Sequence, residues 1–180
     1  MENQKQKALI VKEFKKPPVY GDFDIPQPGP DQVQIKVIAS TINPSDRITI
    51  EGGYWRTEPN FIGGLEGYGE VIKAGSALGE NLVGKKVSFN TVQGTWAEYT
   101  VASVANCWVV DDDVPIESKA SGVINPITVV GFVDMFRKWR NRGSAAKGLI
   151  NSAAASALGR MLNKFCQKEN IPLLNIVRRA

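Results

Sequence analysis

Residues 148–177, near the end of a chain of 180 residues, constrain the fold more than any other segment. Residues 148–151 and 172–177 are short apolar runs, and between them apolar side chains recur at helical spacing. A strand, a helix and a second strand within about thirty residues predict a βαβ unit, and therefore a parallel pair of strands. Because only three residues follow, we expect the first unit of a parallel sheet without the strands that would complete it. The apolar helix positions are Ala157, Leu158, Met161, Leu162, Phe165 and Cys166.

The turn between the first strand and the helix is built from small residues. Aligned on its last glycine, the dinucleotide-binding pattern G-x-G-x-x-G becomes Ala154, Ser156 and Gly159. Small residues let the backbone approach a pyrophosphate, which accepts hydrogen bonds from free N–H groups at the helix start, here Ala157 and Leu158. Small residues also simply let a helix pack closely on a strand, so the pattern leaves both interpretations open.

Two arginines follow the second strand. Arg178 lies nineteen positions after Gly159, and Arg179 comes next. An acidic residue near this position would bind the ribose 2′-hydroxyl of NAD, whereas arginine suits the 2′-phosphate of NADP. The pair therefore predicts NADPH as the cofactor, and the alternative is a solvated basic tail.

Residues 1 to about 122 are predicted to be mostly β-structure. Alternating apolar and polar residues and short runs between Gly-bearing turns indicate half-buried strands. The expected strands are Lys7–Phe14, Val33–Val37, Gly67–Lys73, Lys86–Phe89 and Trp96–Val101. Five prolines make Pro17–Asp31 a loop or an extended edge. The frequent turns predict a partly closed barrel.

The character of the sequence changes near Asn125. This residue is a favourable helix N-cap, and Pro126 suits the first helical position. The mostly apolar residues 127–139 then predict a buried helix. We therefore divide the chain into a β-rich domain, residues 1–124, and an incomplete cofactor-binding domain, residues 125–180.

Composition excludes several classes of function. The chain contains no histidine, which removes the commonest general base and the commonest catalytic metal ligand. The net charge of +4 is mild and both signs are interspersed, so no nucleic-acid partner is expected. No apolar run is long enough to span a membrane. The N-terminal residues show no targeting signal, which leaves the cytoplasm and the mitochondrial matrix as alternatives.

Three segments of loop-like composition lie between the expected strands: the polar Asn43–Asp46 and the Gly-rich Glu51–Tyr54 and Gly63–Gly69. Loops carry function more often than core strands do, although ordinary turns have the same composition. These segments could therefore form a site or serve only as turns.

Taken together, these segments resemble the medium-chain dehydrogenase/reductase superfamily, over essentially the whole chain and as the front half of a longer member. Asn43-Pro44-Ser45-Asp46 falls where zinc alcohol dehydrogenases have a Cys-x-Thr-Asp ligand motif, and Gly64-Leu65-Glu66-Gly67 falls where they have Gly-His-Glu-Gly. Asn43 and Leu65 thus replace two zinc ligands, and the four-cysteine zinc lobe is absent. The resemblance is to the zinc-free branch, the quinone oxidoreductases and 2-enoyl thioester reductases, and it implies no metal.

Four motifs resemble the enoyl thioester reductases in particular. They are the segment from Asn43 to Tyr54, the turn Gly94-Thr95-Trp96, the helix start Asn125-Pro126-Ile127-Thr128 and the turn Ser156-Ala157-Leu158-Gly159-Arg160. The resemblance implies a GroES-like, partly closed β-barrel followed by the first βαβ of a Rossmann-type parallel sheet, with NADPH as cofactor. It implies Tyr54 near the substrate carbonyl or as proton donor, Asn43 near the nicotinamide and Ser45 in the same catalytic segment. It adds Asn125 and Thr128 to the cofactor-binding residues.

We expect an NADPH-dependent, zinc-independent reductase of activated double bonds in enoyl thioesters, quinones or related enones. The isolated chain is expected to bind NADPH weakly or not at all and to turn over negligibly. Tyr54 is alternatively a surface tyrosine beside Trp55, and Glu66 is expected to be a hydrogen-bonded structural carboxylate rather than a catalytic one.

Two other functions stay open. One is a non-catalytic scaffold or accessory subunit, in which a protein partner covers the exposed sheet edge. The other is a zinc-independent alcohol or aldehyde reductase on the same fold. For the complete protein, the resemblance implies a homodimer paired through the cofactor domain.

Overall fold

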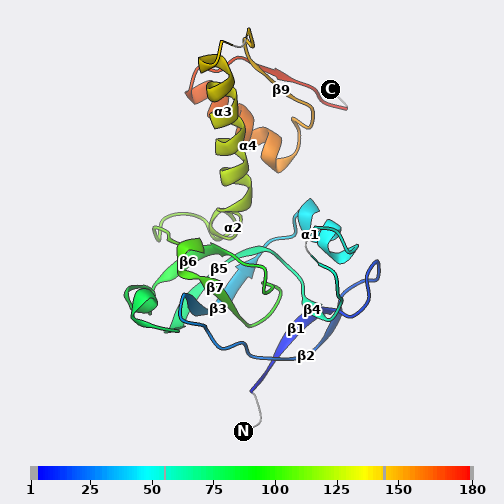
Figure 1. The fold of residues 1–180 in the computed structure, drawn as a ribbon, viewed down its shortest axis with the longest axis vertical. Helices are drawn as coiled ribbons and strands as arrows, with labels where there is room; N and C mark the ends of the chain where they lie inside the picture. Colours follow the sequence, from blue (N-terminus) through cyan, green and yellow to red (C-terminus); the bar gives the residue numbers. More distant parts are fainter. Residues whose placement is uncertain (1–3, 55, 144, 179–180) are drawn as a thin grey trace. The chain divides into compact units, whose positions relative to one another are not determined.

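The computed structural model describes residues 4–54, 56–143 and 145–178. It contains two compact units, Met1–Val123 and Ile124–Ala180, coloured from blue to green and from yellow-green to red in Figure 1. Strands dominate the first unit and helices the second, so the chain is a mixed α and β protein, as the sequence predicts. Within the described ranges, no helix is long and apolar enough to cross a membrane.

Two antiparallel sheets form the first unit. The larger has the order β7-β3-β5-β6-β8 and the smaller the order β2-β1-β4. The strands are β1 (Lys5–Val11), β2 (Val19–Asp24), β3 (Gln32–Ser40), β4 (Phe61–Ile62), β5 (Glu66–Ala74), β6 (Lys86–Asn90), β7 (Tyr99–Ser103) and β8 (Cys107–Val109). An isolated bridge between Ala8 and Ala97 connects β1 to the segment before β7.

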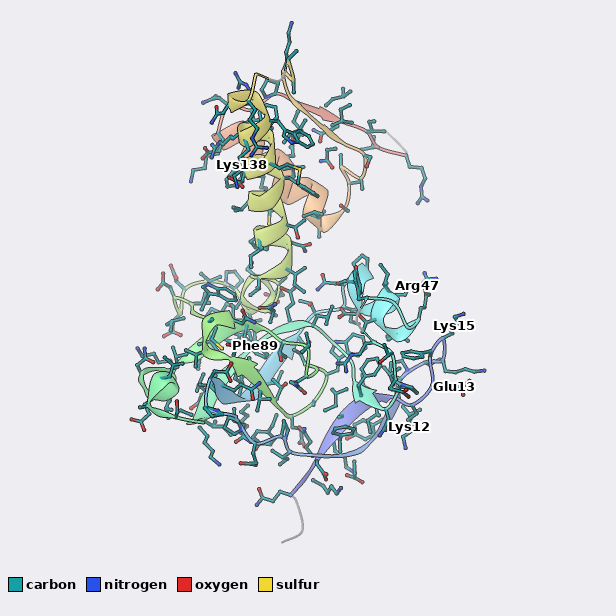
Figure 2. All side chains as sticks on the ribbon, viewed as in Figure 1. Lys12, Glu13, Lys15, Arg47, Phe89 and Lys138 are labelled. Atoms are coloured by element: carbon teal, nitrogen blue, oxygen red, sulfur yellow. The ribbon has the colours of Figure 1, made fainter. Side chains whose placement is uncertain are left out.

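The core of the first unit lies around β3, β5 and β6. Val33 and Ile35 of β3 and Val71 of β5 are completely buried, with Ile35 opposite Val71 in the antiparallel ladder. Figure 2 shows Phe89 of β6 among these strands, and its side chain is also completely buried. The alternation that predicts a half-buried strand at residues 33–37 is thus confirmed by β3.

The start of the chain differs in detail from the prediction. β1 ends at Val11 rather than at Phe14, because the chain turns there and Lys15 has a φ of +63°. Part of the proline-rich segment 17–31 forms β2, which pairs with β1 at the edge of the smaller sheet. Short helices join the later strands: α1 (Pro44–Ile50), η1 (Ala77–Leu82), η2 (Val104–Asn106) and α2 (Ile116–Ala120).

The second unit is a βαβ unit preceded by a long helix. Its elements are α3 (Ile124–Asn141), β9 (Leu149–Asn151), α4 (Ala157–Lys168) and β10 (Leu173–Asn175). The two strands pair in parallel, with Leu149 opposite Leu173 and Ile150 opposite Leu174. α3 and α4 lie side by side (Figure 1). They share a cluster of the buried residues Val129, Val133, Leu162 and Cys166, which confirms the predicted apolar face of α4.

The helix predicted after Asn125 begins earlier and is less buried than expected. α3 starts at Ile124, so Asn125 lies inside its first turn and is not the N-cap. Pro126 fits there because N–H groups of a first turn have no acceptor within the helix. Residues 127–139 do not form a buried helix, since only Val129, Val133 and Phe136 of α3 are buried.

Candidate active site

A buried carboxylate organises the candidate site in the first unit. Glu66, the first residue of β5, is 0% exposed. Its Oε1 atom accepts hydrogen bonds from Asn43 Nδ2 at 2.8 Å and from Thr41 Oγ1 at 3.2 Å. Its Oε2 atom accepts one from the backbone N–H of Val123 at 3.2 Å. Because burying a carboxylate without partners is costly, these donors make Glu66 the hydrogen-bonded carboxylate that the sequence predicts.

Asn43 joins this carboxylate to a second one. Asn43 is the N-cap of α1, and its backbone N–H donates to Asp46 Oδ2 at 2.5 Å in a capping box. Burial raises the pKa of Asp46 to about 6, and the Glu66 carboxylate adds to that rise, while the backbone N–H groups of Asn43 and Leu65 lower it. Asn43 is therefore bonded to two buried carboxyl groups, through its backbone and through its side chain.

The turn before β7 holds the backbone of Glu66. The Glu66 carbonyl oxygen accepts hydrogen bonds from Ser40 Oγ at 3.0 Å and from Thr95 Oγ1 at 3.2 Å. The indole Nε1–H of Trp96 donates to the Thr41 carbonyl oxygen at 2.8 Å. The segment Ser40–Thr41 and the turn Gly94-Thr95-Trp96, far apart in the sequence, thus together support the backbone at Glu66.

Close packing explains the glycines of this support. A Cβ atom on Gly63 would lie 2.4 Å from the ring of Trp96, and one on Gly64, whose φ is +86°, would lie 2.3 Å from Thr95 Oγ1. The backbone N–H of Trp96 donates to the Gly63 carbonyl at 2.9 Å. Trp96 is therefore part of a turn, and β7 begins at Tyr99 rather than at Trp96 as predicted.

Ser45 and Tyr54, the other predicted catalytic residues, lie within and after α1. Ser45 is in the first turn, and its Oγ atom is buried and meets no hydrogen-bonding partner among the described residues. Tyr54 follows the helix, is 58% exposed and has a φ of +58°. That φ is a genuine outlier for a bulky side chain, and such strain clusters at functional sites. Since seven helical residues span roughly 10 Å, Asn43 and Tyr54 flank α1 at its two ends.

In the second unit, the predicted cofactor turn is capped by Ser156. Ser156 Oγ accepts a hydrogen bond from the backbone N–H of Gly159 at 3.0 Å and donates one to the Ala153 carbonyl at 2.7 Å. The first N–H groups of a helix have no intrahelical acceptor, so this cap leaves those of Ala157 and Leu158 for a ligand. A Cβ atom on Gly159 would lie 2.2 Å from the Ala153 carbonyl oxygen, so only glycine permits this close approach. The turn therefore fits a pyrophosphate.

The other predicted cofactor residues differ in their surroundings. The Ala154 N–H donates to the Ile176 carbonyl at 3.3 Å, and the Leu158 side chain packs against the α3–α4 cluster. Thr128 Oγ1 donates to the Ile124 carbonyl at 2.7 Å. Asn125 is half-buried and Arg178 is exposed, whereas Arg179 lies outside the described residues.

Comparisons with known proteins agree with these features. Residues 29–112 match the family described as alcohol dehydrogenase GroES-like domain. The chain is 31% identical over 181 residues to the mitochondrial enoyl-[acyl-carrier-protein] reductase of Caenorhabditis elegans, which covers 97% of this chain and 51% of that protein. The chain therefore spans about half the length of the curated relatives it matches.

Two solved structures resemble the chain along nearly its whole length. A protein assigned as an NADPH:quinone reductase from Mesorhizobium loti gives a TM-score of 0.86 at 30% identity, covering 99% of this chain and 56% of that one. A mycobacterial protein solved in complex with NADPH gives a TM-score of 0.81 at 25% identity, covering 97% and 53%. This chain belongs to the medium-chain dehydrogenase/reductase superfamily. It corresponds to the N-terminal portion of a zinc-free member, in a family of NADPH-type oxidoreductases.

The zinc-free character has a structural counterpart in this medium-chain dehydrogenase/reductase. Asn43 stands where zinc alcohol dehydrogenases have a zinc ligand. Its side-chain amide instead donates a hydrogen bond to Glu66 Oε1. Within the described ranges, no group of three or more His, Cys, Asp or Glu side chains could hold a metal ion.

Sequence reasoning missed three polar residues that build the site. Thr41 and Thr95 donate to Glu66, and Asp46 anchors the backbone of Asn43. Thr41 lies in a loop after β3, where a polar residue has no distinctive spacing. Thr95 belongs to the turn Gly94-Thr95-Trp96, which the resemblance singled out without assigning Thr95 to the site. Asp46 did carry a signal, because it stands three residues after an Asn N-cap, in the acidic position of a capping box.

Proposed function

We propose that this chain carries the substrate-side domain, residues 1–124, and the first part of the cofactor-binding domain, residues 125–180, of an NADPH-dependent reductase. The reaction would be zinc-independent and would reduce activated double bonds of enoyl thioesters, quinones or related enones. The observation that carries the proposal is the buried Glu66 carboxylate, to which Asn43 donates a 2.8 Å hydrogen bond at a position where zinc alcohol dehydrogenases have a ligand motif. Similarity to an enoyl-[acyl-carrier-protein] reductase along 97% of the chain supports the substrate class.

Several residues of the second unit would hold the cofactor. The free N–H groups of Ala157 and Leu158 would bind the pyrophosphate, because they lie at the positive end of the α4 dipole. Exposed Arg178, with Arg179 next in the sequence, would pair with the 2′-phosphate. NADPH would then supply a hydride to the β-carbon of the substrate.

Two residues of α3 would complete the contacts with the cofactor. Asn125 lies in the first turn and can offer its amide. Thr128 already donates its hydroxyl proton to the Ile124 carbonyl, so it can meet the cofactor only as an acceptor.

Tyr54 would act on the substrate carbonyl. Negative charge develops on the carbonyl oxygen as the β-carbon is reduced, and a phenol hydroxyl can stabilise this charge or supply the proton. The positive φ and exposure of Tyr54 support such a role, because backbone strain clusters at functional sites and an exposed side chain can meet a substrate.

The test is the Tyr54→Phe variant, assayed with NADPH and a crotonyl thioester. We assay the 180-residue chain and, where this chain is part of a longer protein, that protein. One lost oxyanion donor lowers kcat by about 10²–10³, while NADPH affinity is expected to stay the same. The control is Tyr20→Phe, which removes a phenol hydroxyl from an exposed edge strand. An unchanged kcat in Tyr54→Phe would remove this residue from the mechanism.

The isolated chain is expected to bind NADPH weakly and to turn over negligibly. The described part of its parallel sheet has two strands, and Ile150 and Leu174 on it are 69% and 61% exposed. Parallel sheets are normally covered on both faces, so the cofactor site has few supporting elements. Rapid NADPH oxidation by this chain with crotonyl thioester would contradict the expectation.

The same exposed residues favour one alternative, a non-catalytic scaffold or accessory subunit. A partner that covered Ile150 and Leu174 would use the sheet as a docking surface without any need for NADPH. Where this chain is part of a longer protein, the Tyr54 assay of that protein separates the two functions, because a scaffold has no turnover for the substitution to lower.

A further inference from the structure

The Asn43 side chain uses both of its N–H groups inside the protein. Its Nδ2 atom donates to Thr41 Oγ1 at 2.9 Å and to Glu66 Oε1 at 2.8 Å. Thr41 Oγ1 in turn donates to the same Glu66 oxygen at 3.2 Å. The Asn43 amide is therefore hydrogen-bonded to one oxygen of Glu66 both directly and through the Thr41 hydroxyl.

The chemistry of Glu66 determines which way the Asn43 amide faces. An ionised carboxylate only accepts hydrogen bonds, whereas an amide offers a donor side and an acceptor side. Only the NH₂ side of Asn43 can therefore face Glu66. The carboxylate is itself fixed, because Val123 N–H donates to its other oxygen and the side chain is completely buried.

We propose that Glu66 is a positioning residue that fixes the polarity of the Asn43 side chain, so that Asn43 meets a ligand only as a hydrogen-bond acceptor through Oδ1. A carbonyl oxygen has two lone pairs, so the capping box with the Asp46 N–H leaves acceptor capacity on this atom. The identity of the ligand rests on the proposed reductase function, whereas the orientation of the amide does not.

This orientation of the amide gives Asn43 and Tyr54 different roles in the site. The reacting carbonyl of a thioester, a quinone or an enone is an acceptor, so Asn43 cannot stabilise its developing charge. Asn43 instead suits a neutral donor, such as the primary amide of a nicotinamide or a ribose hydroxyl. The donor to the substrate carbonyl must then be another group, and Tyr54 is the candidate in the same segment.

The decisive substitution is Glu66→Gln, which keeps size and removes one acceptor. A glutamine side chain has one oxygen and one NH₂ group, so it cannot accept from both Val123 N–H and Asn43. Val123 donates from the backbone, so the glutamine oxygen turns toward it and its NH₂ group faces Asn43. The Asn43 amide then turns over and presents its own NH₂ group to the ligand. Glu70→Gln makes the same change on the same strand at a partly exposed side chain and serves as the control.

The measurement is hydrogen exchange of the Asn43 side-chain NH₂ by NMR in the 180-residue chain. Hydrogen bonds to a charged acceptor slow exchange by about tenfold or more, so we expect slow exchange in the wild type and in Glu70→Gln. We expect that protection to be lost in Glu66→Gln. Exchange at the rate of a free amide in the wild type, or unchanged protection in Glu66→Gln, would overturn the proposal. Should Glu66→Gln not fold, Thr41→Val removes a single acceptor and is expected to release only one of the two protons.

Kinetics separates this proposal from the proposed function. Exchange needs neither cofactor nor turnover, so it decides the amide orientation even in the 180-residue chain, for which negligible turnover is expected. Absent reductase activity in a longer protein that contains this chain would refute the proposed function and leave that result unchanged. In a preparation that turns over, Glu66→Gln is expected to raise KM for NADPH by about tenfold, since one buried charge-assisted bond is lost, with KM for the thioester unchanged. A rise in thioester KM alone would instead place Asn43 at the substrate and refute its assignment to the cofactor.

Discussion

The two units bury their apolar residues to very different extents. In the first unit Val33, Ile35 and Val71 are completely buried between antiparallel strands. In the second unit α3 and α4 share a small buried cluster, while Ile150 of β9 is 69% exposed. A mostly apolar pocket of about 350 Å³ runs from α3 to the start of α4, with Phe132 and Ile150 in its lining.

The difference follows from the two kinds of sheet. An antiparallel sheet can bury one face and leave the other to solvent, whereas a parallel sheet is normally covered on both faces. The first unit therefore supports a fixed arrangement of polar groups around Glu66. The second unit provides a helix start suited to a phosphate, beside two described strands on which Ile150 and Leu174 are exposed.

The largest expected effect is a difference in unfolding free energy between two phenylalanine-to-alanine variants, one in each unit. Phe89→Ala removes a completely buried ring from the first unit, whereas Phe132→Ala removes a ring that is 42% exposed from the second. We expect Phe89→Ala to lower the free energy of unfolding by about 3–5 kcal/mol. Phe132→Ala should cost less than about 1 kcal/mol, because part of the ring already meets water. The measurement is urea unfolding followed by backbone amide signals of each unit.

Equal losses of unfolding free energy in Phe89→Ala and Phe132→Ala would contradict the difference in burial between the two units. Such a result would mean that Phe132 is covered in solution, by self-association or by another surface, and it would depend on protein concentration.

A second contrast concerns carboxyl groups. Burial raises the pKa of Asp46 to about 6 from 3.8, while Asp134 of α3 is exposed and pairs with Lys138 at 2.7 Å. Between pH 3.8 and about 6 the folded chain holds a proton on Asp46 that the unfolded chain has lost. The contribution of this group to stability is therefore complete below pH 3.8, falls as pH rises to about 6, and is constant above.

Asp46→Asn keeps the shape of the side chain and removes this titration. Across that pH window, the free energy of unfolding of the wild type should decline relative to that of Asp46→Asn, and the two should run parallel above pH 6. Asp134→Asn makes the same change at an exposed side chain and is the control. Parallel curves for wild type and Asp46→Asn throughout the window would show that Asp46 is hydrated in solution.

The sequence predicts the elements of both units better than it predicts the site. Period-two alternation located β3, and helical spacing located α4, because each depends on neighbours along the chain. The Glu66 network depends on hydrogen bonds that Thr41, Thr95 and Val123 donate to Glu66. These donors lie far apart in the sequence and become neighbours of Glu66 only when the sheets form. The burial of residues 127–139 was predicted wrongly, because an apolar run indicates a helix without showing how much packs against it.

The smallest expected effect tests the uncovered face directly. Ile150→Asn places an amide on β9 at a position that is 69% exposed, so the free energy of unfolding should change by less than about 0.5 kcal/mol. Val33→Asn, the matched change on β3, buries the same amide at a completely buried position and should destabilise the first unit by about 1–3 kcal/mol or more. Because apolar patches promote association, Ile150→Asn should also reduce any self-association, which sedimentation velocity measures. A large loss of stability in Ile150→Asn that grows with protein concentration would show that copies of the chain cover this face. The contrast in burial between the two units would then hold only for the monomer.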